Sequence, residues 1–389
     1  MSKPIISDSI KYIGADDTTL DLFESQYKVP NGVSYNSYVI LDKKTAVMDT
    51  VDARKTDEWF DNLKNALNGK PADYLVISHL EPDHSANIKQ FTEKYPDAKL
   101  VLSAKAKTML PQFFDISGLD ERCITVKEGD ELDLGTHKLK FIMAPMVHWP
   151  EVMVEYETTE KVLFSADGFG KFGALSTDED WTCEARRYYF NIVGKYGTPV
   201  QTLLKKAAGL DIKTICPLHG PVLKDNLEFY INKYKIWSSY EPEDDGVLVA
   251  CASIHGNTKA AAEKMVEILN EKGAKKVAFT DLTRDDMAEA VEDAFRYSKL
   301  IVAAASYDAG VFPPMEDFLN RLSHKSYQKR TAGIIENGSW APTAARCMKT
   351  SFDSMKDIKV CENTVTIKST MKPEDIISME KLADEILSN

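Results

Sequence analysis

The stretch 74–84, Tyr-Leu-Val-Ile-Ser-His-Leu-Glu-Pro-Asp-His, joins a short apolar run to a dense group of polar side chains. The apolar run 74–77 predicts a buried strand. Alternate residues leaving the end of a strand can converge on one point, and imidazoles with carboxylates suit iron, manganese or zinc rather than copper or calcium. We therefore expect a metal site here rather than a polar loop with two incidental histidines. Its four potential ligands, within six positions, are His79, Glu81, Asp83 and His84.

Length and composition predict a soluble protein with more than one core. The chain has 389 residues, of which 43% are hydrophobic and 28% charged, and this length favours two domains. No apolar run is long enough to cross a bilayer, and residues 1–4 lack a signal-peptide pattern, so we expect a cytoplasmic protein. The net charge of −12 argues against nucleic-acid binding as the main task.

The cysteines indicate that electrons would have to come from another protein. Six cysteines are scattered along the chain without a Cys-x-x-Cys pair. This pattern favours neither a disulfide framework nor a zinc ribbon. It also excludes a built-in rubredoxin-like or iron–sulfur module, which needs such pairs. The six are Cys123, Cys183, Cys216, Cys251, Cys347 and Cys361.

The first part of the chain alternates strand-like runs with helical stretches, which indicates two sheets covered by helices. Helical spacing over 54–68 places Trp59, Phe60, Leu63 and Leu67 on one face. A further helix over 224–239 closes this part. Hairpins are predicted over 37–49 and 152–164, and single strands over 100–102 and 139–142.

A charged segment with proline and glycine, 240–246, is the best linker candidate. After it the pattern changes to strand, loop and helix, repeated. Strands that are apolar throughout and alternate with helices predict a doubly wound parallel sheet. The expected domains are therefore 1–242 and 247–389. The strands of the second domain are predicted at 247–250, 277–279, 300–304 and 332–335.

The first loop of the second domain predicts a phosphate site. Hydroxyls, a glycine and the start of a helix near Lys259 together form a cradle for an anion. The loop has neither the Gly-Lys-Ser/Thr ending of a P-loop nor the G-x-G-x-x-G fingerprint. It is similar to the flavodoxin loop that takes the single phosphate of FMN, while an ordinary turn before a helix is the alternative. The candidate residues are Ser253, His255, Gly256, Asn257 and Thr258.

Two later loops of the second domain complete the predicted FMN site. Ligands of doubly wound sheets lie at the carboxyl ends of strands near the switch point. Tyr307 and Trp340 can border an isoalloxazine ring, although loop-to-core packing would also explain them. The candidates are Ser306, Tyr307, Asp308, Ala309 and Gly310 after the third strand, and Asn337, Gly338, Ser339 and Trp340 after the fourth.

Three more metal-ligand candidates fall at or beyond predicted strand ends: His148, Asp167 and His219. Each alone would be read as structural. Together with the group at 79–84 they give four imidazoles and three carboxylates, which is enough for two metals with open positions. We expect one carboxylate, Asp167, to lie between the metals and bridge them.

The pattern His79-x-Glu81-x-Asp83-His84, with three later ligands and a flavodoxin-like domain, resembles the flavodiiron proteins (A-type flavoproteins). The resemblance covers nearly the whole chain and is supported by the stretches 34–38, 148–151 and 311–315. It implies an N-terminal metallo-β-lactamase-like αββα sandwich followed by a flavodoxin-like doubly wound parallel sheet. It also implies FMN and a non-haem diiron centre that reduces dioxygen to water, nitric oxide to nitrous oxide, or both.

The resemblance further implies how ligands and partners are arranged. One iron would take His79, Glu81 and His148, the other Asp83, His84 and His219, with Asp167 bridging. Family members form head-to-tail homodimers, in some cases dimers of dimers. The simplest class, which lacks a fused electron-transfer module, is often supplied with electrons by rubredoxin.

Two positions separate this chain from related proteins. Hydrolytic zinc enzymes of the metallo-β-lactamase type carry a second His where this chain has Glu81, and a carboxylate there favours iron that must reach the ferric state. Many flavodiiron proteins have a His after the Phe in the segment near Phe23, where this chain has Glu24. The rival functions are a zinc-dependent metallo-hydrolase with an attached flavodoxin-like domain, and an electron carrier with a structural metal site.

Overall fold

Short apolar strands in the first part of the chain form two sheets that face one another. The computed structural model describes residues 4–389. Side chains of both sheets, such as Val76 and Val101 of the first and Phe141 and Phe164 of the second, share one buried core. The first sheet has the order β1 (Ile10–Tyr12), β6 (Tyr38–Ile40), β7 (Ala46–Met48), β8 (Tyr74–Ile77), β9 (Lys99–Ser103) and β10 (Cys123–Val126).

The second sheet completes the inner layers of the sandwich, and two short pairs of strands form separate small sheets. Its order is β11 (Glu131–Asp133), β12 (Lys138–Met143), β13 (Met153–Glu157), β14 (Val162–Phe164) and β15 (Thr214–Cys216). The short pairs join β2 (Ala15–Asp17) to β5 (Val33–Tyr35) and β3 (Leu22–Phe23) to β4 (Tyr27–Lys28).

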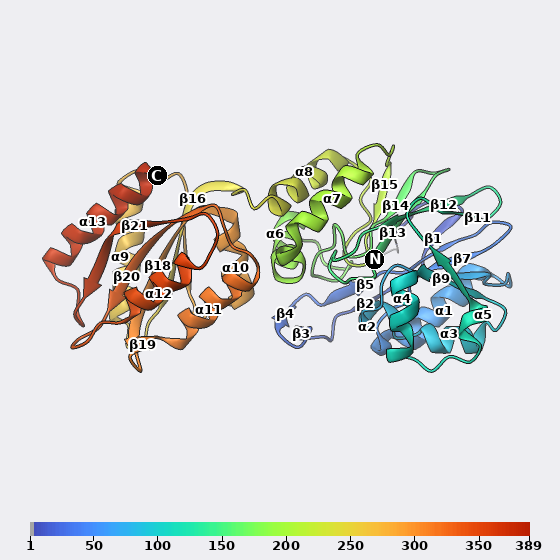
Figure 1. The fold of residues 1–389 in the computed structure, drawn as a ribbon, viewed down its shortest axis with the longest axis horizontal. Helices are drawn as coiled ribbons and strands as arrows, with labels where there is room; N and C mark the ends of the chain where they lie inside the picture. The colour runs from blue at the N-terminus through green and yellow to red at the C-terminus, as the bar shows by residue number, and fades with distance from the viewer. Residues whose placement is uncertain (1–3) are drawn as a thin grey trace. The chain divides into compact units, whose positions relative to one another are not determined.

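Helices cover the outer faces of both sheets (Figure 1). The helix α1 (Thr56–Leu67) buries the four side chains that its spacing predicts. The remaining helices are α2 (Pro82–Ser85), α3 (Ile88–Lys94), α4 (Ala104–Met109), α5 (Leu119–Arg122), α6 (Trp181–Tyr188), α7 (Gly197–Ala207) and α8 (Leu227–Ser238). This is the αββα sandwich that the sequence predicts, and the predicted hairpins are confirmed as β6–β7 and β13–β14.

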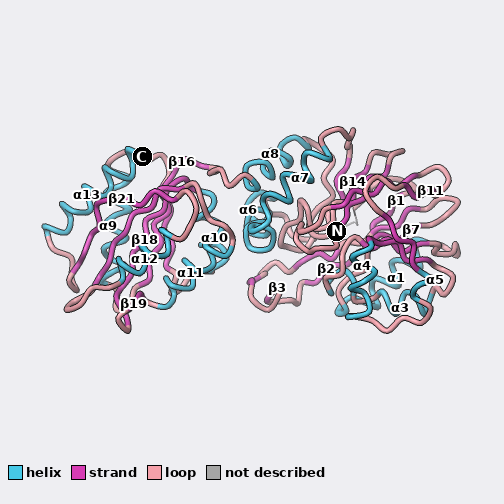
Figure 2. Tube along the Cα trace, viewed as in Figure 1, coloured by secondary structure: helices cyan, strands magenta, loops and turns pink. Residues whose placement is uncertain are grey.

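The second part of the chain folds as a parallel sheet with helices on both faces (Figure 2). The strand order is 2-1-3-4-5, which is the flavodoxin-like arrangement. The strands, in sheet order, are β17 (Val277–Asp281), β16 (Asp244–Ala252), β18 (Tyr297–Tyr307), β20 (Arg330–Asn337) and β21 (Ile358–Ile367), with β19 (Gly310–Val311) pairing β18. The helices are α9 (Asn257–Glu271), α10 (Met287–Arg296), α11 (Pro313–His324), α12 (Ala344–Asp353) and α13 (Pro373–Ser388). The predicted fold class is confirmed for both parts.

Two details of the second part differ from the sequence prediction. The segment 240–246 is not linker throughout, because β16 already begins at Asp244. Asp244 pairs with Lys276 and Arg296, and these ion pairs hold the charged start of the strand to its neighbours. The fifth strand, β21, was not predicted, since most of its side chains are exposed or half-buried and its apolar signal is weak.

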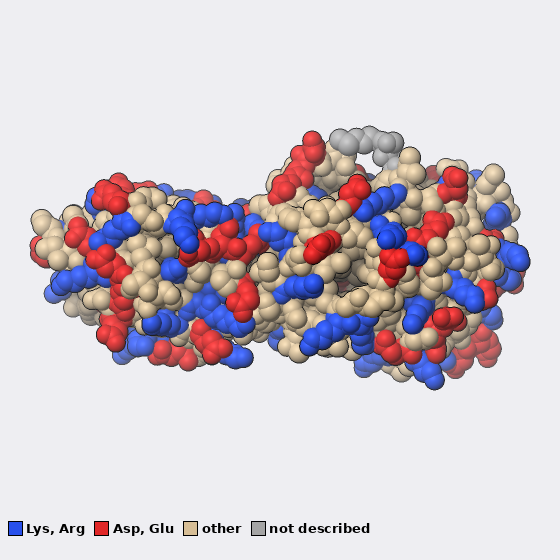
Figure 3. Space-filling model, turned by 90° about the horizontal axis from the view of Figure 1, so that it is seen from above, with Lys and Arg blue, Asp and Glu red and all other residues tan. Residues whose placement is uncertain are grey.

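The chain separates into two compact units. One comprises Met1–Tyr189 and Thr198–Lys235, and the other comprises Phe190–Gly197 and Ile236–Asn389. The boundaries 1–242 and 247–389 remain our proposal for the independently folding domains. Among residues 4–389, no helix combines the length and apolar character needed to cross a membrane. Acidic and basic side chains are interspersed on the face shown in Figure 3, so the net negative charge does not form a single acidic surface there.

Candidate metal centre and cofactor pocket

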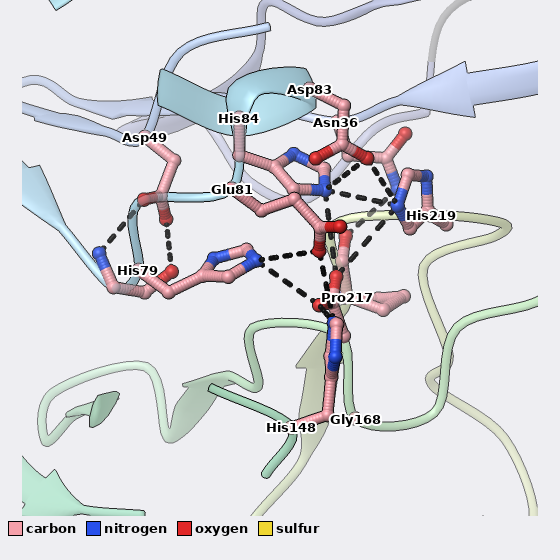
Figure 4. Close-up of polar contacts among 12 residues, drawn as sticks. Asn36, Asp49, His79, Glu81, Asp83, His84, His148, Gly168, Pro217 and His219 are labelled. Atoms are coloured by element: carbon pink, nitrogen blue, oxygen red, sulfur yellow. Dashed lines mark hydrogen bonds and ion pairs between the residues drawn. The ribbon is translucent and has the colours of Figure 1, made fainter. Parts of the chain in front are cut away.

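Four side chains of the segment after β8 lie close to one point, but the backbone of this segment is not extended as we expected. Pro82 starts the short helix α2, which carries Asp83 and His84, while His79 and Glu81 lie in the preceding loop. Proline suits the first helical position because it needs no N–H partner there. The helical turn therefore replaces the alternation that we expected, yet the four side chains still converge (Figure 4).

The three later candidates approach the same point from other loops, and Figure 4 shows His148 and His219 among them. His148 comes from the loop between β12 and β13, Asp167 follows β14, and His219 follows β15. All seven predicted metal-ligand candidates are thus brought together. Each of two groups, His79–Glu81–His148–Asp167 and His84–Asp167–His219, offers ligand atoms within 4.8 Å of one another.

Asp167 lies at the middle of the cluster and faces both groups. Its Oδ2 is 3.2 Å from Nε2 of His79 and 3.2 Å from Nε2 of His148. Its Oδ1 is 3.5 Å from Nε2 of His84 and 3.7 Å from Nε2 of His219. One carboxylate oxygen therefore serves each half of the cluster, as a bridging ligand between two cations would.

The other two carboxylates each belong to one half. Oε2 of Glu81 is 2.9 Å from Nε2 of His148 and 3.7 Å from Nε2 of His79. Oδ2 of Asp83 is 3.3 Å from Nε2 of His84 and 3.2 Å from Nε2 of His219. The geometry therefore sorts the seven side chains into two sets of three with Asp167 shared.

Several atoms of the cluster are buried without a hydrogen-bond partner among the described residues. They include Nε2 of His79, Nε2 of His148, both carboxylate oxygens of Asp83 and Oδ1 of Asp167. Native proteins rarely leave buried polar atoms unpaired, and these atoms approach one another without forming hydrogen bonds. Cations held between them would satisfy all of these atoms, so the donor set fits two metal ions.

The electrostatics of the cluster also favour positive charge. Burial alone would lower the pKa of His148, but the carboxylates of Asp167 and Glu81 raise it to about 10. For His79, too, burial lowers the pKa, but the carboxylate of Asp167 raises it well above the usual range. The imidazoles of His79 and His148 would thus hold protons where metal ions can take their place.

Residues around the cluster fix the ligands. Nδ1 of His219 donates to the carbonyl oxygen of Ser34 at 2.7 Å, which leaves Nε2 free for a metal. Asp49 accepts the main-chain N–H and the hydroxyl of Ser78, both at 2.8 Å, and so holds the backbone directly before His79. The side-chain amide of Asn36 donates to the carbonyl oxygens of Pro217 and Gly220 on either side of His219. We did not predict these contacts, because each joins residues far apart in the sequence.

One side of the cluster is open. The side chains of His79, His84 and His219 are inaccessible, whereas Glu81 retains 16% of its exposure. A cavity of about 250 Å³ lies beside Glu81 and Asp83, and Phe23 and Glu24 form part of its wall. Burial raises the pKa of Glu24, and the carboxylate of Glu81 adds to the effect. A small molecule can reach the cluster from this side.

A second cavity, of about 620 Å³, lies at the carboxyl ends of the strands of the parallel sheet. It is lined by twelve of the fourteen residues predicted to bind FMN; Gly256 and Gly310 are not among its lining residues. Its size is typical of a cofactor site. The prediction missed five lining residues. Some of them have no side chain that is typical of phosphate or flavin binding, and one follows a strand that we did not predict. The five are Ile254, Ala305, Ala341, Thr343 and Ser369.

The first loop of this cavity has the features of an anion site. Gly256 adopts the left-handed conformation, with φ of 95°, directly before α9, and no side chain caps the helix. The first N–H groups of α9 are therefore available to a phosphate. The hydroxyl of Ser253 accepts the N–H of Gly256 at 3.0 Å and so stabilises the turn.

Several known proteins are similar to this chain in sequence or in fold. Residues 33–220 match the family described as ODP family beta lactamase. An uncharacterised protein of Methanocaldococcus jannaschii is 29% identical over 95% of this chain and 94% of its own length. The anaerobic nitric oxide reductase flavorubredoxin of Salmonella arizonae is 26% identical over 95% of this chain and 78% of its own. The solved structure of rubredoxin oxygen:oxidoreductase from Desulfovibrio gigas has a TM-score of 0.92 at 25% identity and covers 100% of this chain and 98% of that one.

Proposed function

We propose that this chain is a flavodiiron protein that reduces dioxygen to water, nitric oxide to nitrous oxide, or both. The chain is an oxidoreductase. The observation that carries the proposal is the position of Asp167, whose two oxygens face two separate sets of ligands. Two metal ions held by these two sets of residues would be able to bind one small gas molecule, or two, side by side.

We propose that His79, Glu81 and His148 hold one iron, that Asp83, His84 and His219 hold the other, and that Asp167 bridges them. Three carboxylates favour an ion that must become ferric, because hard anionic oxygen ligands stabilise the higher charge. When bound, two ferrous ions would supply one electron each and reduced FMN two more, which matches the four electrons that reduce dioxygen to water.

The residues of the chain would position and protect this chemistry. The imidazoles and carboxylates fix the two metal positions, and Phe23 packs edge-on against the ring of His219 with 5.4 Å between ring centres. Trp149 lies edge-on to His79 and His148. These aromatic rings exclude water from the flanks of the cluster and leave the side of Glu81 and Glu24 for entry of the gas.

For electron supply we propose FMN in the second cavity and rubredoxin, or a similar small carrier, as the external donor. The helix start at Asn257 would take the phosphate, and Tyr307 and Trp340 would border the flavin ring. We further propose a head-to-tail homodimer, in which FMN of one protomer serves the metal centre of its partner. Sedimentation of the protein at several concentrations tests the dimer separately from the activity.

The test of the proposed function is gas consumption by protein loaded with iron and FMN. Reduced rubredoxin is supplied, and the initial rates of nitric oxide and dioxygen consumption are compared at one donor concentration. Consumption of either gas supports the proposal, and the faster gas identifies the physiological substrate. Consumption of neither gas by fully loaded protein contradicts it.

A zinc-dependent metallo-hydrolase is the second candidate, since the αββα fold and the ligand positions also suit zinc hydrolysis. Glu81 argues against it, because the corresponding zinc enzymes have a histidine there. Protein that retains only zinc and cleaves thioesters or lactones would favour the hydrolase. An electron carrier with a structural metal would bind FMN fully and consume neither gas.

A further inference from the structure

A buried carboxylate outside the metal cluster joins two of the loops that supply its ligands. Glu151 lies three residues after His148 and is only 2% exposed. Its Oε1 accepts the main-chain N–H of Leu80 at 2.9 Å. Leu80 stands between His79 and Glu81, so this one hydrogen bond connects the loop of His148 to the backbone between two other ligand candidates.

Both ends of this connection are anchored. The carbonyl oxygen of Leu80 accepts the hydroxyl of Ser85 at 2.8 Å, so the main chain of Leu80 is held on both sides. The main-chain carbonyl of Glu151 accepts the hydroxyl of Ser103 at 2.8 Å. Ser103 in turn caps α4 by accepting the N–H of Ala106. Glu151 is therefore fixed to the end of β9 while its side chain holds Leu80.

We propose that Glu151 is a positioning residue. It holds His79 and Glu81 at the right distance and orientation relative to His148, and thereby maintains one of the two metal positions. A hydrogen bond from a backbone N–H to a buried carboxylate is stronger than one between neutral groups. Since Leu80 is rigidly placed between the two ligands, losing this bond would let both ligands move relative to His148. The inference rests on the proposed two-metal centre.

The effect should be confined to one half of the cluster. His79, Glu81 and His148 are all carried by the two loops that Glu151 connects. The other half depends on different contacts: Asp83 and His84 lie on α2, and His219 is held by its hydrogen bond to Ser34. Loss of the Glu151 hydrogen bond should therefore weaken one metal position and spare the other.

The experiment compares Glu151→Gln with Glu151→Met in the full-length chain. The two replacements have similar size, but only glutamine keeps an oxygen that can accept the N–H of Leu80. Each protein is loaded anaerobically with ferrous iron, and iron per chain and the Mössbauer spectrum are measured. For Glu151→Met we expect the affinity of one iron to fall about 10- to 100-fold, a typical loss when an outer partner of a ligand is removed. Glu151→Gln should retain both irons.

A matched control is Glu157→Met. Glu157 is also fully buried and accepts two main-chain N–H groups, those of Thr159 at 2.8 Å and Glu160 at 2.6 Å, and its remaining partner, His137, lies outside the cluster. This variant should bind both irons with unchanged spectra. If Glu151→Met does not fold, Glu151→Asp, which keeps the charge but shortens the reach, provides the same test.

Equal retention of both irons by the Glu151 variants would overturn the inference, as would equal loss of both. Loss of one iron from the glutamine and methionine variants alike would also overturn it, since the acceptor oxygen would then not matter. Failure of the unaltered protein to bind two metal ions would instead refute the proposed diiron centre, and the two failures are distinguished by the stoichiometry of the unaltered chain.

Discussion

The metal cluster and the FMN cavity differ in how far their side chains are buried and fixed in position without a bound ligand. In the cluster the ligand atoms are buried and their backbone is held by other side chains, such as Asp49 on Ser78. In the cavity the rim is open: Tyr307 is 45% exposed and Trp340 92% exposed. Burying unpaired charge is costly, so a metal site must have its ligands aligned in advance. A flavin brings its own apolar surface and can cover exposed aromatic rings.

This difference predicts how the two sites respond to damage. Removing a central ligand should abolish metal binding outright, because no solvent can replace it in the buried cluster. Changes at the open cavity should weaken FMN in smaller steps, because binding is distributed over three loops. The two sites should also respond independently, since each is built within its own compact unit.

The largest effect is expected for Asp167→Asn. The replacement keeps the shape but removes the charge shared by both halves of the cluster. Iron content should fall at both positions, and gas consumption should fall at least about 100-fold, equivalent to about 2.7 kcal/mol of barrier. Flavin absorbance should not change. Asp211→Asn, the same change at an exposed residue paired with Lys161, is the control; retention of both irons by the Asp167 variant would contradict the bridging assignment.

Metal addition should stabilise only the first unit. A ligand that binds the folded state at about one hundred times its Kd stabilises it by about 2.7 kcal/mol. Calorimetry of metal-free, FMN-loaded protein, with and without ferrous iron, should therefore show a shift in the unfolding transition of the first unit alone. A shift of both transitions, or release of FMN on metal removal, would contradict the independence of the two sites.

The convergence of the seven candidate ligands could be predicted from the sequence because their chemistry is concentrated in a few positions. Four candidate ligands stand within the stretch 79–84, and His148, Asp167 and His219 follow strands that the apolar pattern also reveals. The parallel order of the second sheet agrees with the repeated strand–loop–helix pattern. Here local sequence and tertiary structure carry the same information.

The residues that support the ligands could not be predicted in this way. Glu151 and Asn36 act through hydrogen bonds to Leu80 and Pro217, which are distant in sequence. The helical turn of α2 replaced the expected extended chain, because Pro82 favours the first position of a helix. The edge strand β21 exposes many polar side chains, so its apolar pattern was too weak to identify.

A moderate effect is expected for Gly256→Ala at the start of α9. Nothing lies within 4 Å of the added Cβ, so only the left-handed conformation, with φ of 95°, opposes the change. An alanine in that region costs roughly 1–2 kcal/mol, and relaxation of the loop would misplace the phosphate cradle. We expect FMN affinity to fall about 10-fold, measured by fluorescence titration.

The control for this change lies at the other end of the same helix. Gly273 also has a left-handed backbone, with φ of 81°, and equally open surroundings, but it follows the last turn of α9 and not the loop that lines the cavity. Gly273→Ala should lower stability by a similar amount and leave FMN affinity unchanged. If both alanine variants weaken FMN equally, the effect comes from general destabilisation rather than from the loop.

The smallest effect is expected for Trp340→Ala. The indole is 92% exposed, so its removal should not change the stability of the apoprotein. If it stacks on the flavin, the lost aromatic contact amounts to about 0.5–1.5 kcal/mol, which weakens FMN by up to about 10-fold. Ile377→Ala, at an exposed apolar residue of α13 that does not line the cavity, should change neither property. Unaltered FMN affinity in the Trp340 variant would show that the exposed ring does not contribute to the site. The rim of the cavity would then stay open to solvent when FMN is bound as well.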